Sequence, residues 1–203
     1  MKYIRAYSNG NCNGFPFASM EISGTTRMMY NNGNCNGIHE WSMKKTDRCT
    51  EVYERPGLNG IPYNYFKYTG RGVEFYPNGN GNGIPTFYFK FRGSDAVEVY
   101  PNGNGNGMPE WYFRKRGHMV EFYPNGNGNG IPTFFFKFRG SNAVEVYPNG
   151  NGNGMPEWYF EKRGRMVVFY PNGNGNGIPV YSFDGADDVR DVIEWVFYLY
   201  IPH

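Results

Sequence analysis

One eight-residue segment constrains the fold of this chain more than any other feature. Tyr-Pro-Asn-Gly-Asn-Gly-Asn-Gly occurs five times without change. The five copies begin at Tyr76, Tyr100, Tyr123, Tyr147 and Tyr170. Three looser copies precede them, at residues 7–14, 30–37 and 53–60. Successive copies start 23 or 24 residues apart, and a period in this range indicates a tandem repeat architecture.

Each repeat predicts a β-hairpin. Residues 97–100, Val-Glu-Val-Tyr, alternate apolar and polar side chains, which is typical of a half-buried strand. The Asn-Gly segment that follows is rich in residues that make tight turns, and residues 110–116 alternate again as a second strand. Eight such hairpins predict an all-β protein of about sixteen antiparallel strands, arranged as an elongated, twisted meander sheet. Because the second half also repeats at 47 residues, a four-bladed propeller is an alternative.

The two faces of the predicted sheet differ in chemistry. Val97, Val99, Trp111 and Phe113 share one parity, whereas the tyrosines and most strand charges have the other. Glutamates fall on the first strand of a hairpin and lysines or arginines on the second, so we expect ion-pair rungs worth roughly 0.2–1 kcal/mol each. The apolar face carries aromatic side chains that bury about 150–250 Å² each, and it must therefore be covered.

The last segment departs from the repeat. We divide the chain into a hairpin array at residues 1–183 and a capping segment at residues 184–203. Apolar residues recur at helical spacing from Val189 to Ile201, with Asp187 or Asp188 as the N-cap, which predicts a helix. The β-branched and aromatic content of the same residues leaves a strand as the alternative.

The loop pattern, aromatic-x-Asn-Gly-x-x-x-Gly on a period near 23, resembles the MORN repeat. Seven of the eight copies fit it, and the copy at Tyr53 lacks Asn-Gly. The resemblance implies hairpins laid side by side in an elongated sheet that serves as a scaffold or a binding surface. After the turn this chain has Gly-Ile-Pro or Gly-Met-Pro, where the MORN pattern has Gly-x-Gly.

A second resemblance concerns residues 53–60. Tyr-Glu-Arg-Pro-Gly-Leu-Asn-Gly, followed by Tyr63 and Phe66, is similar to the βγ-crystallin hairpin signature. That resemblance implies a sandwich of Greek-key units. The signature recurs here every 23 or 24 residues, whereas the crystallin motif recurs about every forty.

The asparagines of the five identical loops are the candidate binding residues. Repeated amide groups beside Tyr and Trp rings could hydrogen-bond and stack on carbohydrate, and identical copies would add avidity. The same loops lack the carboxylates of a Ca²⁺ site and the lysine of a phosphate-binding loop, and turns that need positive φ explain their glycines without a ligand. The candidates are Asn78, Asn80, Asn82, Asn102, Asn104, Asn106, Asn125, Asn127, Asn129, Asn149, Asn151, Asn153, Asn172, Asn174 and Asn176.

Other chemistry finds little support in the sequence. Cys12 and Cys35 occupy equivalent places in neighbouring hairpins, roughly 9–10 Å apart, which exceeds the Cα separation of about 7 Å that a disulfide tolerates. His39, His118 and His203 fall at unrelated places, so we expect no catalytic set, no metal site and no cofactor.

The composition and net charge limit the classes of partner that we expect. A net charge of +2 predicts no nucleic-acid binding, and no apolar run is long enough for a membrane helix. The odd number of cysteines and a start without an apolar signal segment predict an intracellular location. We therefore expect a non-catalytic structural or scaffold protein that binds protein partners or further copies of itself through its sheet surface or edges. The alternative is a multivalent carbohydrate-binding protein.

Overall fold

The structure is a computed structural model, and it describes residues 1–54, 58, 60–77, 79, 81–148 and 152–192. The described residues form sixteen β-strands, each antiparallel to the next in the chain. In chain order the strands are β1 (Lys2–Tyr7), β2 (Ala18–Ser23), β3 (Thr26–Tyr30), β4 (Trp41–Lys45), β5 (Cys49–Tyr53), β6 (Asn64–Thr69), β7 (Gly72–Tyr76), β8 (Phe87–Arg92), β9 (Ala96–Tyr100), β10 (Trp111–Arg116), β11 (Met119–Tyr123), β12 (Phe134–Arg139), β13 (Ala143–Tyr147), β14 (Trp158–Arg163), β15 (Met166–Tyr170) and β16 (Tyr181–Asp184).

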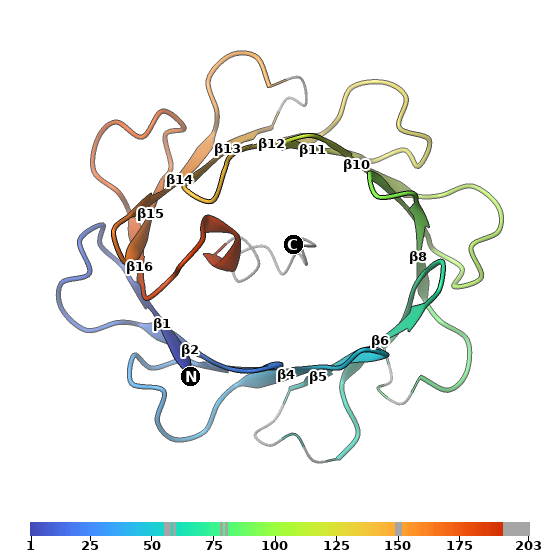
Figure 1. The fold of residues 1–203 in the computed structure, drawn as a ribbon, viewed down its shortest axis with the longest axis horizontal. Coiled ribbons are helices and arrows are strands. Elements are labelled where there is room, and N and C mark those ends of the chain that lie inside the picture. The colour runs from blue at the N-terminus through green and yellow to red at the C-terminus, as the bar shows by residue number, and fades with distance from the viewer. Residues whose placement is uncertain (55–57, 59, 78, 80, 149–151, 193–203) are drawn as a thin grey trace.

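The sheet is closed. β1 pairs with β16, with Arg5 opposite Asp184 and Ala6 opposite Phe183, so the strands form one barrel that appears as a ring in Figure 1. The predicted hairpins are confirmed, but the open meander sheet is wrong, as are the sandwich and the propeller. Closure turns the apolar face of every hairpin toward a common interior and pairs the two terminal strands with each other.

The inner face carries the predicted apolar parity set. Val97 lies opposite Phe113, and Val99 lies opposite Trp111. The Trp111 ring stacks on Phe87 at a centroid distance of 5.5 Å, and equivalent stacking joins Phe134 to Trp158 at 6.4 Å. Large rings from neighbouring hairpins therefore interleave around the barrel wall.

Residues 185–192, the described part of the segment after β16, lie inside the ring of strands (Figure 1). A barrel of about sixteen strands has an interior too wide for wall side chains alone to fill. Val189 and Val192 are fully buried, and they belong to the same apolar cluster as Phe136 and Val146 of the wall. The helix predicted from Val189 is present at 189–192, and the remainder of that prediction lies outside the described residues.

Acidic side chains cap this helical turn and attach it to β1. The Asp188 carboxylate accepts the Arg190 backbone N–H at 2.8 Å, while the Asp191 carboxylate accepts the Asp188 N–H at 3.2 Å. These reciprocal bonds resemble a capping box and confirm Asp188 as the N-cap. Lys2 Nζ lies 2.9 Å from Asp187 and 2.7 Å from Asp191, and its hydrogen bond, with its charge second, lowers the pKa of Asp187.

The outer face carries the predicted ion-pair rungs. Arg114 Nε lies 2.6 Å from a Glu121 carboxylate oxygen, and the Tyr123 hydroxyl donates to the same oxygen at 3.0 Å. The Arg114 guanidinium also lies over the Tyr123 ring, 5.1 Å from its centroid. Comparable Tyr–Glu bonds recur at 2.6–3.0 Å on β5, β7, β9 and β13. Each of these carboxylates therefore bonds the tyrosine two residues along its own strand, and Glu74, Glu98, Glu121 and Glu145 also pair with a lysine or arginine of the preceding strand.

These tyrosines predict an alkaline transition. Burial, with the adjacent glutamate second, raises the pKa of Tyr53, Tyr76 and Tyr147 to about 12. Because the unfolded value is about 10, their neutral forms contribute stability that is fully present below about pH 10 and is lost as the pH rises toward about 12. An ultraviolet titration of tyrosinate, run beside circular dichroism, should show these rings ionising only as the protein unfolds. Full ionisation near pH 10 in a folded protein would contradict this.

Candidate functional site

Eight ten-residue loops, one per hairpin, are the most distinctive surface of the protein. They connect the two strands of every hairpin, and because the strands alternate in direction all eight lie at the same end of the barrel. Figure 1 shows the described parts of the loops spread around the outside of the ring. The loops span residues 8–17, 31–40, 54–63, 77–86, 101–110, 124–133, 148–157 and 171–180.

The predicted asparagines lie in these loops, and their amides partly fold the loops themselves. Asn102 Nδ2 donates to the Asn106 carbonyl at 3.0 Å, and Asn104 Oδ1 accepts the Asn106 N–H at 2.9 Å. The second bond recurs at Asn127 and Asn174. The candidates that the structure describes are exposed, whereas Asn78, Asn80, Asn149 and Asn151 lie outside the described residues. Their role in binding stays a prediction.

Neighbouring loops touch through a glycine and a proline. A Cβ on Gly126 would lie 2.0 Å from the Pro109 carbonyl oxygen of the preceding loop, so only glycine fits there. Gly173 makes the same approach and donates its N–H to the Pro156 carbonyl at 3.1 Å. The first and last loops meet in this way too, because Gly10 lies against Pro179. Among the described residues, six of the eight junctions between neighbouring loops have this contact, including the junction between the first and last loops.

A second loop glycine covers an aromatic ring on the outer wall. A Cβ on Gly128, whose φ is +65°, would lie 2.5 Å from the Tyr112 ring. The equivalent residues Cys12 and Cys35 also have positive φ, 56° and 52°. Beneath each of them the wall residue is a serine instead of an aromatic ring. Ser182 Oγ accepts the Cys12 N–H at 3.0 Å, and Ser19 Oγ accepts the Cys35 N–H at 3.1 Å.

At these positions the volumes of the loop residue and the wall residue beneath it compensate each other. A large wall ring lies under a loop glycine, and a wall serine lies under a loop cysteine. Cys12 and Cys35 are free thiols, as the spacing predicted. Burial raises the pKa of the Cys12 thiol, so the thiol form is favoured at this position. The positions of both cysteines are therefore explained by packing against the wall serines.

Every loop also exposes a large apolar side chain directly after its last glycine, and we call this set of eight the apolar crown. Between 74% and 96% of each of these residues is exposed. Each follows a glycine with φ between 85° and 107°, and seven of the eight precede a proline, which restricts the preceding residue to extended backbone. The crown consists of Phe15, Ile38, Ile61, Ile84, Met108, Ile131, Met155 and Ile178.

The crown is the part of the site that sequence reasoning missed. Gly-Ile-Pro and Gly-Met-Pro are visible in the sequence, but an apolar residue between turn residues is equally compatible with a buried anchor. Only the folded backbone shows that the side chains point into solvent. The signal that could have found them is the constant spacing from the last loop glycine.

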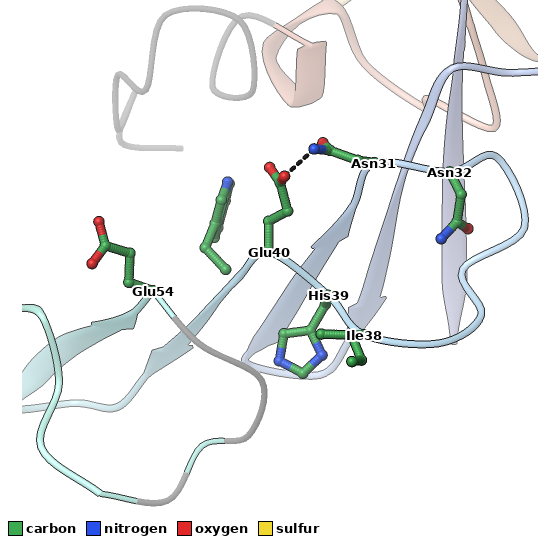
Figure 2. A pocket seen from close by; sticks show the side chains of 7 residues that line it. Asn31, Asn32, Ile38, His39, Glu40 and Glu54 are labelled. Carbon is green, nitrogen blue, oxygen red and sulfur yellow. Dashed lines mark hydrogen bonds between the residues drawn. The ribbon is translucent and has the colours of Figure 1, made fainter.

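A shallow depression of about 620 Å³ lies beside the second loop. It is lined by Asn31, Asn32, Ile38, His39, Glu40, Trp41 and Glu54. Asn31 Nδ2 donates to a Glu40 carboxylate oxygen, and Glu40 lies between Asn31 and Glu54 in Figure 2. Amide, carboxylate and indole groups therefore meet at one place on the loop end of the barrel.

Metal-binding clusters and membrane-spanning helices are both absent from the described residues. No group of three or more His, Cys, Asp and Glu side chains is placed there to hold a metal ion. No helix in the described part of the chain is long and apolar enough to cross a membrane.

Comparison with known proteins assigns no relationship. No protein-family model matches the chain, and no curated protein matches its sequence. The fold and the site therefore define it as a closed sixteen-stranded barrel of hairpin repeats, over the residues that the structure describes.

Proposed function

We propose that this protein is a non-catalytic structural or scaffold protein, a ring-shaped unit that binds protein partners or further copies of itself. The observation that carries the proposal is the use of the repeated polar residues. Glu121, Arg114 and Tyr123 bond one another on the wall, and Asn102, Asn104 and Asn106 bond within their loop. The repeated polar residues therefore hold the fold together, and the exposed apolar side chains around the rim remain to make contacts. This arrangement favours a protein that acts through its surface.

Closure changes the route of assembly that the sequence suggested. With β1 paired to β16, the described barrel has no open strand for another chain to extend. Interaction through sheet edges is therefore disfavoured, and the loops and the outer wall become the proposed contact surfaces.

The proposal is tested by cross-linking in the cells that make the protein, followed by binding measurements with purified components. We expect reproducible cross-links from the loops or the wall, either to another copy or to one partner protein that also binds in purified form. If neither contact is found, or if the purified protein turns over a substrate, the proposal fails.

Carbohydrate binding is the second candidate. The depression at Asn31, Glu40 and Trp41 favours it, because it places amide and carboxylate groups beside an aromatic ring, the combination that sugar recognition uses. A glycan array comparing the native protein with Trp41→Ala tests this depression. Asn104→Ala and Asn127→Ala test the repeated loops. An array without signal for the native protein would remove this candidate.

A further inference from the structure

We infer that the apolar crown is a self-association surface, on which a second copy of this chain docks rim to rim. This inference rests on the proposed structural function and names its partner. The crown is a set of eight side chains at equivalent positions, each mostly exposed, around one end of a closed ring. Scattered exposed apolar residues need no explanation, but one at the same place in every repeat is a pattern that extends around the whole rim.

The size of the crown suits a stable dimer. Fully burying one Ile, Met or Phe side chain removes about 60–120 Å² of apolar surface from water, since it is worth about 1.5–3 kcal/mol at about 25 cal/mol per Å². Eight such side chains therefore offer on the order of 500–1,000 Å² on each partner. Stable protein interfaces bury about 800 Å² per partner.

The repeat itself makes the rim self-complementary. Adjacent hairpins are related by two strand spacings, roughly 10 Å along the wall, and each hairpin carries one crown residue at the same place in its loop. When two identical rims face each other about a two-fold axis, apolar side chains of one can meet apolar side chains of the other along the whole ring. A two-fold contact of this kind uses the same patch on both copies and closes on itself.

The charge of the loops favours a protein partner over an anionic lipid surface. Among the eight loop sequences, Arg55 is the one lysine or arginine, whereas Glu40, Glu54, Glu110 and Glu157 are acidic. Anionic lipid headgroups attract Lys and Arg, and these loops offer a net negative charge instead. A second crown brings loops with the same small number of charged residues, so docking leaves few charges to desolvate.

Sedimentation velocity tests the inference with a triple variant in three adjacent loops, Ile84→Asn, Met108→Asn and Ile131→Asn. We expect the native protein to dimerise and the variant to have a dimer dissociation constant at least tenfold higher. The matched control changes polar residues of the same loops, Asn82→Ser, Asn106→Ser and Asn129→Ser, and should dimerise as the native protein does. Thermal melting should show that the variant still folds, because its substituted side chains are exposed.

Three results would overturn the inference. The first is a native protein that stays monomeric at high concentration. The second is a triple variant that dimerises with native affinity, and the third is a monomer that co-sediments with phosphatidylcholine vesicles through its crown. The second result would leave the proposed structural function intact, because self-association would then use another surface. A monomer that binds one other protein would also leave that function intact. A monomer without any partner would remove both proposals.

Discussion

Gly128→Cys is expected to lower the free energy of unfolding by about 2–5 kcal/mol. A left-handed backbone costs a residue with a Cβ about 1–2 kcal/mol, and forcing extra atoms into a packed site costs about 1–3 kcal/mol more. Gly128 meets both conditions, since its φ is +65° and a Cβ there would lie 2.5 Å from the Tyr112 ring. Urea denaturation under reducing conditions measures the loss.

The matched control is Gly117→Cys. Gly117 has a similar φ, +58°, with nothing within 4 Å of a Cβ, so this variant should lose about 1–2 kcal/mol from the backbone alone. Equal losses at Gly117 and Gly128 would show that the loop does not lie on the Tyr112 ring.

Tyr112→Ser should partly rescue Gly128→Cys. The pairs Cys12–Ser182 and Cys35–Ser19 show that a loop cysteine and a wall serine fit together. In the first pair Ser182 Oγ also donates to the Asn9 carbonyl at 2.5 Å. A double-mutant cycle should therefore show a favourable coupling of about 0.5–3 kcal/mol. Strictly additive effects would contradict the contact.

Val189→Asp should have the second large effect, a loss of about 3–5 kcal/mol, because it places a charge without a partner in an apolar interior. Val189 is fully buried in the cluster that joins the segment after β16 to the barrel wall. The control is Arg190→Ala, one residue away, whose guanidinium lies 4.0 Å from Asp188. A partly exposed ion pair contributes about 0–1 kcal/mol, so this variant should unfold almost as the native protein does.

Chemical denaturation followed by near-ultraviolet circular dichroism compares the two variants. Native stability for Val189→Asp would mean that the segment after β16 does not fill the barrel interior.

The hairpins could be predicted from the sequence because their information is local. The alternation at Val97 and Val99 places both on the inner face, and the Glu98 and Lys90 pairing across β8 and β9 follows from the same parity. Turn residues mark where each strand ends. The helix start at Asp188 was equally local, since an N-cap acts on the first turn alone.

Closure could not be predicted in the same way. Whether sixteen strands curl until the ends meet depends on small angles added over every pair, and no single repeat encodes their sum. The chain does hold one clue. Cys12 in the first loop and Ser182 in the last strand repeat the exchange seen at Cys35 and Ser19, which makes physical sense when β1 and β16 are neighbours. The sequence alone does not reveal this pairing, because recognising it requires knowing which loop covers which strand.

The candidate site also has a part that the local sequence predicts and a part that it does not. The loop asparagines were recognisable as loop residues, and their binding role stays a prediction. The apolar crown was not recognised, because the exposure of Ile84 or Met108 depends on the backbone around it.

The central claim, a ring closed between β1 and β16, is tested most directly by an engineered disulfide. Arg5→Cys and Asp184→Cys place thiols on directly opposed residues of the two strands. The background replaces each native cysteine with a residue that other copies carry there: Cys12→Gly, Cys35→Gly and Cys49→Ala. Opposed residues of an antiparallel pair have Cα atoms about 4.5–5.5 Å apart, within disulfide reach.

Mass spectrometry after mild oxidation of dilute protein gives the answer. A closed barrel predicts near-complete intramolecular disulfide between residues 5 and 184. An open sheet of the same sixteen strands would hold these residues roughly 70 Å apart, fifteen strand spacings of about 4.8 Å. Two free thiols, or disulfides only between molecules, would contradict the closed ring.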